Sequence, residues 1–497
     1  MQVSTNRKNV TIAMMIATFL AAIEVTVVST AMPTIISDLG GINLISWVYA
    51  VYLLTTSVTT PIYGKLADLF GRKMIFSVGT LIFLCGSMLS GLAHSMDQLI
   101  FFRAIQGIGA GAVMPITFTI IGDIYTFEER AKMQGLFSGI WGISGILGPL
   151  VGGFFVDAIS WRWIFYFNVP FGLVSLIMVW MFLHETFEKK KHQIDILGAG
   201  VFTIGATALL YALLSGGQTW PWSSPVLIAL FCLAFAALLL FVRIETKVKE
   251  PILPLHLFRM RVISVSNLAS FLISAVLIGI NAYVPLWIQG VLGYSATGSG
   301  LTLTPMSISW TLGAIVGGRL MLKIGSRKVA LIGTLCIAIA SIWAATVSIH
   351  TGYVIFVCIM FIAGVGFGFS VTSFTVVVQS SVSWNLRGVA TASISFVRTL
   401  GQMIGVVLFG TVFNHTLQGF LKGHSVQGIN TIEDFNKLLN PEFAKQLPQP
   451  LLHTLREVFV SGISHVYLSL AVIAVLGYIA TWRLPRFEGN ANAQKSE

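Results

Sequence analysis

Charged residues are scarce in this chain of 497 residues, where Asp, Glu, Lys and Arg together make up only 10%. Soluble domains carry about 25%, so the composition excludes an ordinary soluble globular protein. Acidic residues are fewer than basic ones, with 19 Asp and Glu against 30 Lys and Arg. The basic residues lie in short loops between apolar runs, so the net charge of +11 does not indicate nucleic-acid binding.

Cysteine is also rare. The chain has four cysteines, and all fall inside apolar segments: Cys85, Cys232, Cys336 and Cys358. Buried single cysteines behave as small apolar residues, so they predict neither a disulfide framework nor a metal site, and no metal is expected.

Apolar residues are abundant, at 55% of the chain with a mean hydropathy of +0.85. Runs of about 20 apolar residues, long enough to cross a bilayer, recur from end to end. They predict an all-α polytopic membrane protein. The first run leads directly into a second one, so no cleavable signal peptide is expected.

The apolar runs predict fourteen transmembrane helices, whose expected ranges follow the chain in order. These are 10–31, 44–65, 74–93, 97–121, 132–156, 163–183, 195–215, 223–243, 262–289, 297–321, 329–349, 353–379, 388–412 and 460–482.

Two charged loops divide these spans into six, two and six. Glu185–Gln193 follows the sixth span, and Arg243–Arg261 follows the eighth. The expected domains are therefore an N-terminal six-helix bundle, a linker with two additional helices, and a C-terminal six-helix bundle. Their ranges are 1–184, 185–261 and 262–497.

The loop charges predict that both termini are cytoplasmic, because Lys and Arg favour the inner side of a membrane. In this orientation only five Lys and Arg residues lie on the outer side of the membrane: Arg162, Lys422, Lys437, Lys445 and Arg456. The large outer loop, about 415–459, is expected to form a partly helical cap, with disorder as the alternative.

An internal repeat supports two related halves. Gly64–Lys73 (GKLADLFGRK) resembles Gly318–Arg327 (GRLMLKIGSR), with matching glycines at the same places. Two parallel six-span repeats are a known transporter plan, with the binding site between them near the midplane.

Two charges are expected deep in the membrane. Glu24 lies in the first span, where a carboxylate is costly and marks a functional site by default. A structural glutamate bonded to a neighbouring helix is the alternative. Arg103 in the fourth span lies at a similar depth with the opposite sign, but the sequence does not show whether the two touch.

Two further sets of residues predict a gate that opens and closes during transport. Asp68 and Arg72 lie on the tight loop after the second span, with Asp123 as an expected partner of Arg72; the alternative is a loop that only fixes orientation. The fifth span carries a glycine stripe around Pro149, which permits close helix packing and bends the helix. Plain small-residue packing is the alternative.

Four motifs in order carry a resemblance to a known family. They are the loop 64–73, the RxxQGxG pattern of Arg103–Gly109, the Gly-Pro pattern within 144–153 and the aromatic segment Trp161–Pro170. Together they resemble the major facilitator superfamily, and the six-two-six plan resembles its fourteen-span drug:proton antiporters, such as bacterial quaternary-ammonium and multidrug exporters. The resemblance covers essentially the whole chain.

The resemblance implies the major-facilitator fold and proton-driven export. It implies a coupling role for Arg103 and a gating role for Asp68 and Arg72. It also implies an antiporter motif, formed by Gly145, Gly148, Pro149, Gly152 and Gly153. Glu24 stands where the family usually has Asp, and Leu69 replaces a commonly basic residue. The C-terminal half lacks a deep carboxylate, which argues against export of divalent cations.

The expected function is a proton-coupled antiporter that exports amphipathic, cationic or zwitterionic drugs. It needs no cofactor, because the proton gradient drives it. The candidate cavity residues, each with lipid-facing or packing roles as the alternative, are Glu24, Tyr52, Arg103, Met114, Asn281, Gln289, Trp310 and Phe374. Aromatic and Met surfaces suit adaptable apolar and cationic ligands.

The expected partners are small-molecule substrates, protons and the lipid bilayer, with no nucleic acid. The expected setting is a bacterial cytoplasmic membrane, with the chain acting as a monomer. A dedicated exporter or importer of one metabolite, lipid or antibiotic is an alternative on the same fold. A membrane sensor or enzyme is a second alternative. No metal-ligand cluster or nucleophile constellation favours it, so no enzyme is expected.

Overall fold

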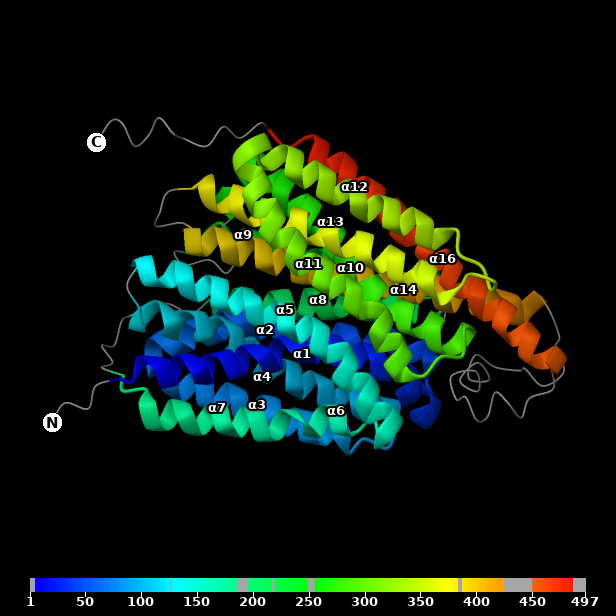
Figure 1. Ribbon diagram of the computed structural model, residues 1–497, viewed down its shortest axis with the longest axis horizontal. Helices are drawn as coiled ribbons and strands as arrows, with labels where there is room; N and C mark the ends of the chain where they lie inside the picture. The colour runs from blue at the N-terminus through cyan, green and yellow to red at the C-terminus, as the bar shows by residue number, and fades with distance from the viewer. Residues whose placement is uncertain are drawn as a thin grey trace.

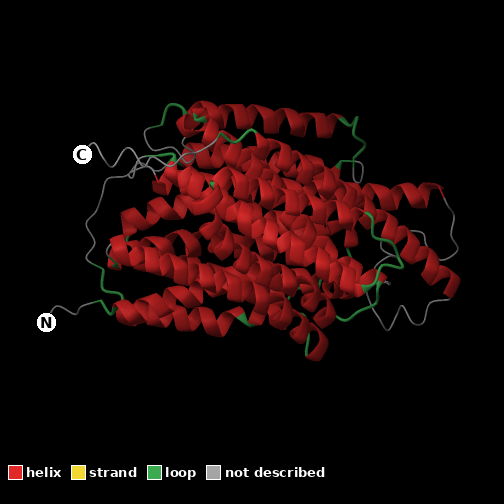
Figure 2. Ribbon diagram, turned by 45° about the horizontal axis from the view of Figure 1, so that its top comes forward, coloured by secondary structure: helices red, strands yellow, loops and turns green. Residues whose placement is uncertain are grey.

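The computed structural model describes residues 5–125, 127–185, 195–216, 220–248, 255–382, 387–423 and 449–485. Within these ranges the chain is built from long helices (Figures 1 and 2). The only β feature in them is an isolated bridge between Gly216 and Trp220. Long apolar runs form helices because a helix satisfies its own backbone hydrogen bonds without water.

The N-terminal half holds one short and six long helices. They are α1 (Arg7–Leu39), α2 (Ile45–Phe70), α3 (Arg72–Gly91), α4 (Met96–Ile124), α5 (Phe127–Ala158), α6 (Trp163–Tyr166) and α7 (Asn168–Phe182). The short helix α6 leads directly into α7, and together they form one candidate span, Trp163–Phe182.

Two helices follow, α8 (Ile196–Ser215) and α9 (Pro225–Glu245), and they pack against each other. The C-terminal half then comprises α10 (Arg261–Leu286), the π-helical turn η3 (Trp287–Val291), α11 (Ala296–Ile324), α12 (Ser326–Ala345), α13 (Tyr353–Ser380), α14 (Arg387–Gly423) and α16 (Gln449–Trp482).

Twelve candidate membrane spans occur in the described part of the chain, so the protein is a multi-pass membrane protein. Two of the fourteen expected spans are not among them, those at α8 and α11. The apolar part of α8 is short, at Leu197–Leu213. Helix α11 has 29 residues, but many of them are Thr, Ser and Gly.

Helices extend into both ends of the expected outer loop. Helix α14 continues to Gly423 and α16 begins at Gln449, so both ends of the range 415–459 are helical. The two helices thus extend beyond the expected spans, which end at 412 and begin at 460. Residues 424–448 lie outside the described part, and the expected cap there stays a prediction.

The repeated loop has the same backbone geometry in both halves. Gly71 separates α2 from α3 with φ +91°, and Gly325 separates α11 from α12 with φ +85°. Each glycine also donates its N–H to the carbonyl four residues earlier, Ala67 or Met321. Positive φ favours glycine, which explains why these two positions match in the sequence.

The two halves lie side by side, with the blue-to-cyan helices on one side of Figure 1 and the yellow-to-red helices on the other. The described chain has both of its termini, the start of α1 and the end of α16, at the same end of the molecule. Helix α5 packs on α11, α2 packs on α14, and α8 contacts both α2 and α14.

Candidate functional site

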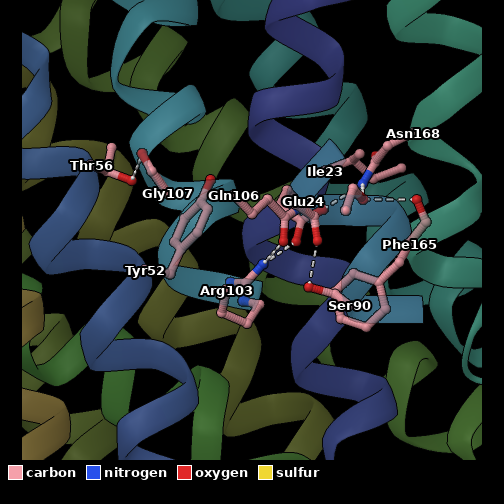
Figure 3. A network of polar contacts seen from close by, with 12 residues as sticks. Ile23, Glu24, Tyr52, Thr56, Ser90, Arg103, Gln106, Gly107, Phe165 and Asn168 are labelled. Carbon is pink, nitrogen blue, oxygen red and sulfur yellow. Dashed lines mark hydrogen bonds and ion pairs between the residues drawn. The ribbon is translucent and has the colours of Figure 1, made fainter. Parts of the chain in front are cut away.

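Glu24 and Arg103 form a buried ion pair. The Arg103 guanidinium donates through Nη1 to Glu24 Oε1, joining α4 to α1 (Figure 3). Glu24 is 0% exposed and Arg103 is 2% exposed. A charge at this depth is very costly unless it is paired, so the contact explains how both side chains are tolerated.

Arg103 has two further partners. Its Nη1 also donates to Gln106 Oε1 at 2.8 Å, one turn along the same helix. Its Cζ lies 4.1 Å from the centroid of the Tyr52 ring, on α2. An arginine over an aromatic face gains a cation–π interaction, so α1, α2 and α4 meet at this one guanidinium.

The other oxygen of Glu24 contacts a different helix. Asn168 Nδ2, at the start of α7, donates to Glu24 Oε2 at 2.7 Å. The same Nδ2 donates to Ser87 Oγ on α3 at 2.9 Å, and Ser87 Oγ donates to the Phe165 carbonyl at 2.8 Å. Figure 3 shows the Glu24 carboxylate between Arg103 and Asn168. Glu24 is thus held inside the N-terminal bundle from two sides.

The loop between α2 and α3 makes the expected ion pair. Arg72 pairs with Asp123, near the end of α4. A third acid, Glu185, accepts hydrogen bonds from the backbone N–H of Arg72 at 2.8 Å and of Lys73 at 3.1 Å. It thereby caps the start of α3, where helix N–H groups lack internal partners. Asp68 belongs to α2, but its side chain lies outside the described part.

The glycine stripe of α5 presents two faces. A Cβ added at Gly148 or Gly152 would meet Thr26 Oγ1 at 1.9 Å or Thr30 Oγ1 at 2.3 Å, both on α1. The other face meets α11. A Cβ at Gly153 would lie 2.5 Å from Thr297 Cα.

The seam between α5 and α11 continues from Gly153 toward the middle of both helices. The Pro149 carbonyl lies 2.2 Å from a Cβ placed at Gly300, and Ser307 Oγ donates to the Gly145 carbonyl at 2.6 Å. At Gly139, nearer the termini, an added Cβ would meet nothing within 4 Å. The close contact between the two helices therefore lies in their middle and at the end opposite the termini.

The other predicted cavity residues are spread over the molecule. Gln289 donates to the Thr30 carbonyl at 2.9 Å, joining η3 to α1 across the two halves. Trp310 stacks on Phe367 at 5.2 Å between centroids. Asn281 and Phe374 are buried on α10 and α13, and Met114 is partly buried on α4. Of the predicted residues, Tyr52 is the one that shares the Glu24–Arg103 contacts.

Three residues of the buried network were not predicted: Ser87, Gln106 and Asn168. Each is a fully buried polar side chain on a largely apolar helix. Asn168 lies within the aromatic segment 161–170, which contributed to the family resemblance but was assigned no site residue. A polar residue inside an apolar run was the available signal.

No group of metal-binding side chains occurs among the residues that the structure describes. The Glu24 carboxyl group directly joins α1, α4 and α7, and through Arg103 and Asn168 the network extends to α2 and α3.

A family model, the Major Facilitator Superfamily, matches residues 14–406. The chain belongs to this superfamily and is a membrane transporter, not an enzyme. The resemblance of the four motifs to this superfamily is thereby confirmed.

Two relatives come from Bacillus subtilis (strain 168). The Multidrug transporter protein MdtP is 39% identical over 401 residues, covering 81% of this chain and 74% of that protein. Multidrug resistance protein 3 is 36% identical over 478 residues, covering 94% of this chain and 93% of that protein.

Solved structures share the fold. A bacterial homologue of the human lysosomal transporter Spinster, in an inward-facing and unoccupied conformation, superposes with a TM-score of 0.71 and 17% identity. The alignment covers 96% of this chain and 97% of that one. The crystal structure of a D-xylose-proton symporter superposes with a TM-score of 0.65 and 15% identity. The alignment covers 97% of this chain and 99% of that one.

Proposed function

We propose that this protein is a proton-coupled antiporter that exports amphipathic drugs, cationic or zwitterionic in character. The names of its two Bacillus relatives support drug transport. The observation that carries proton coupling is the fully buried Glu24 carboxylate, paired with Arg103.

Glu24 is distinct among the buried acids. The described part has two other buried carboxylates, Asp195 and Glu245, and these lie just before α8 and at the end of α9. Glu24 lies within α1, at membrane depth. An exchange of proton for substrate needs a group that can be charged and discharged, and an ionisable residue inside a span is a candidate for that role.

The outer gate of this transporter is the contact surface between the halves. In major-facilitator proteins the site lies between two repeats that rock against each other. Here the α5–α11 seam and the Gln289–Thr30 contact close the end opposite the termini. With both termini in the cytoplasm, this arrangement is closed to the outside. Arg72, Asp123 and Asp68 then belong to the inner gate.

The proposed topology has fourteen spans arranged as six, two and six. It adds α8 and α11 to the twelve candidate spans, because α11 packs along α5 and α13 and α8 packs along α2, α9 and α14. The proposed setting is a bacterial cytoplasmic membrane, where the chain acts as a monomer.

The test is uphill dye efflux from proteoliposomes under an imposed pH gradient, comparing wild type with Glu24→Gln. This substitution removes the titratable group at nearly constant volume. Wild type should export cationic dyes and release protons on substrate addition, and Glu24→Gln should do neither. Equal proton release from both proteins would remove Glu24 from coupling. A metabolite panel run in parallel tests the alternative of a dedicated single-substrate transporter.

A further inference from the structure

We propose that Asn168 and Ser87 position the Glu24 carboxyl group and give it a hydrogen-bond partner both when it is charged and when it is neutral. This inference rests on the proposed role of Glu24 in proton coupling. It adds two positioning residues to the site, from α7 and α3, which the substrate does not need to touch.

The first step is that the two carboxylate oxygens of Glu24 have different hydrogen-bond partners. Oε1 accepts from Arg103, whereas Oε2 accepts from Asn168 Nδ2 at 2.7 Å. The groups facing the carboxylate are Arg103 as the cation, Tyr52 beneath the guanidinium, and the neutral pair Asn168 and Ser87. Arg103 can only donate, so on the Arg103 side the carboxyl group can only accept.

The second step is the hydrogen-bond count at Asn168. Its Nδ2 serves Glu24 and Ser87, and the Ser87 hydroxyl donates onward to the Phe165 carbonyl. Asn168 Oδ1 is buried and has no hydrogen-bond partner among the described residues. A buried amide oxygen without a partner is unusual and costly, so the observed arrangement uses only the donor side of this amide.

The third step is what a proton on Glu24 requires. A neutral carboxyl group gains an O–H donor and needs an acceptor. A half-turn of the Asn168 amide about Cβ–Cγ exchanges Nδ2 and Oδ1, which presents the unused acceptor to Glu24. The Ser87 hydroxyl can then turn from the Phe165 carbonyl to donate to Oδ1. The proton stays on Glu24, and both of its protonation states are hydrogen-bonded in a buried site.

The variants follow from this geometry. Asn168→Leu keeps the approximate volume but removes donor and acceptor, and Ser87→Ala removes only the supporting hydroxyl. Ser175→Ala is the matched control. Ser175 is also fully buried on α7, and its hydroxyl donates to the Ala13 carbonyl of α1 at 2.8 Å. The Ser175→Ala substitution therefore removes an α7–α1 hydrogen bond but leaves the contacts of Glu24 unchanged.

The experiment is infrared difference spectroscopy of the purified full-length protein across a pH series, with Glu24→Gln used to assign the Glu24 carbonyl band. Asn168→Leu should move this band to higher frequency and raise its midpoint pH by up to about one unit, because the hydrogen bond lost by the charged form is stronger than the one lost by the neutral form. Ser87→Ala should cause a smaller change of the same kind. Ser175→Ala should leave band and midpoint as in wild type.

The outcomes separate the inference from the proposed function. If Glu24→Gln removes a titrating band but Asn168→Leu and Ser87→Ala leave it unchanged, the positioning role is overturned and the coupling role stands. If Glu24→Gln removes no band at any pH, Glu24 does not titrate and both proposals fall. If Asn168→Leu does not fold, Ser87→Ala compared with Ser175→Ala decides the inference alone.

Discussion

The carboxylate of Asp157 accepts a hydrogen bond from the backbone N–H of Thr297 at 2.8 Å, and so joins the end of α5 to the start of α11. Its other oxygen accepts from the N–H of Ala296 at 3.2 Å. The first N–H groups of a helix lack internal partners and favour negative charge. An acid of the N-terminal half thus caps a helix of the C-terminal half, at the end opposite the termini.

Removing this cap should loosen that end. Asp157→Ala deletes an N-terminal cap, which costs about 1 kcal/mol. It should therefore reduce the population closed at this end about fivefold relative to the open one. Spin labels at exposed positions 159 and 294 measure the separation directly. Asp97→Ala removes an exposed acid from the first turn of α4, and is the control. Unchanged distance distributions in Asp157→Ala would contradict the role of the cap.

A second prediction concerns the glycine face of α5. Gly153→Ala places a Cβ 2.5 Å from the Thr297 backbone, so α5 and α11 must move apart. Gly139→Ala adds the same methyl group to the same helix, where nothing lies within 4 Å. We expect Gly153→Ala to reduce drug efflux at least tenfold, and Gly139→Ala to retain it. Efflux in cells, corrected for the amount of protein in the membrane, is the measurement. Equal activities would show that the seam tolerates the added atom.

A third prediction concerns the Arg72–Asp123 pair. Both side chains are partly exposed, at 26% and 47%, and such pairs contribute about 0.2–1 kcal/mol to stability. We therefore expect Asp123→Asn to change the melting temperature little but to slow transport, because it weakens the inner gate. Asp68→Asn should insert normally and slow transport severely. Exchanging the charges, with Arg72→Asp and Asp123→Arg in one protein, should recover part of the rate. Full activity of a well-expressed Asp123→Asn protein would remove the gating role.

The sequence predicted the helical membrane fold and the deep charges because each follows from local chemistry. An acid and an arginine inside apolar runs are unusual wherever the helices lie, so Glu24 and Arg103 could be identified without a structure. Their contact could not, since it depends on how α1 and α4 rotate and tilt. The repeated glycines at 71 and 325 were visible for the same local reason, a positive φ between two helices.

The neighbours of Glu24 were harder to predict. Asn168 reaches Glu24 from 144 residues away along the chain, and Ser87 reaches Asn168 from 81 residues away. Helix packing alone brings them together. Met114, Asn281, Trp310 and Phe374 were chosen for residue type and expected depth, and these do not specify which helix face turns toward the Glu24 site.

The last prediction uses the buried pair itself. Arg103→Ala leaves the Glu24 carboxylate buried without its cation, and breaking a buried pair from one side costs about 3–5 kcal/mol. We expect a large fall in the melting temperature of the purified protein in detergent. Adding Glu24→Gln to Arg103→Ala removes the unpaired charge, so the double variant should recover much of the stability while remaining uncoupled.

Arg103→Lys separates charge from shape. Lysine keeps the positive charge but cannot reproduce the planar group that stacks over Tyr52 while donating to both Glu24 and Gln106. It should melt between wild type and Arg103→Ala and show reduced proton release. If Arg103→Ala and the double variant melt at the same temperature, the loss comes from packing rather than from the unpaired carboxylate. The two deep charges would then not stabilise each other, and the coupling role of Arg103 would have to be carried by its contacts with Tyr52 and Gln106.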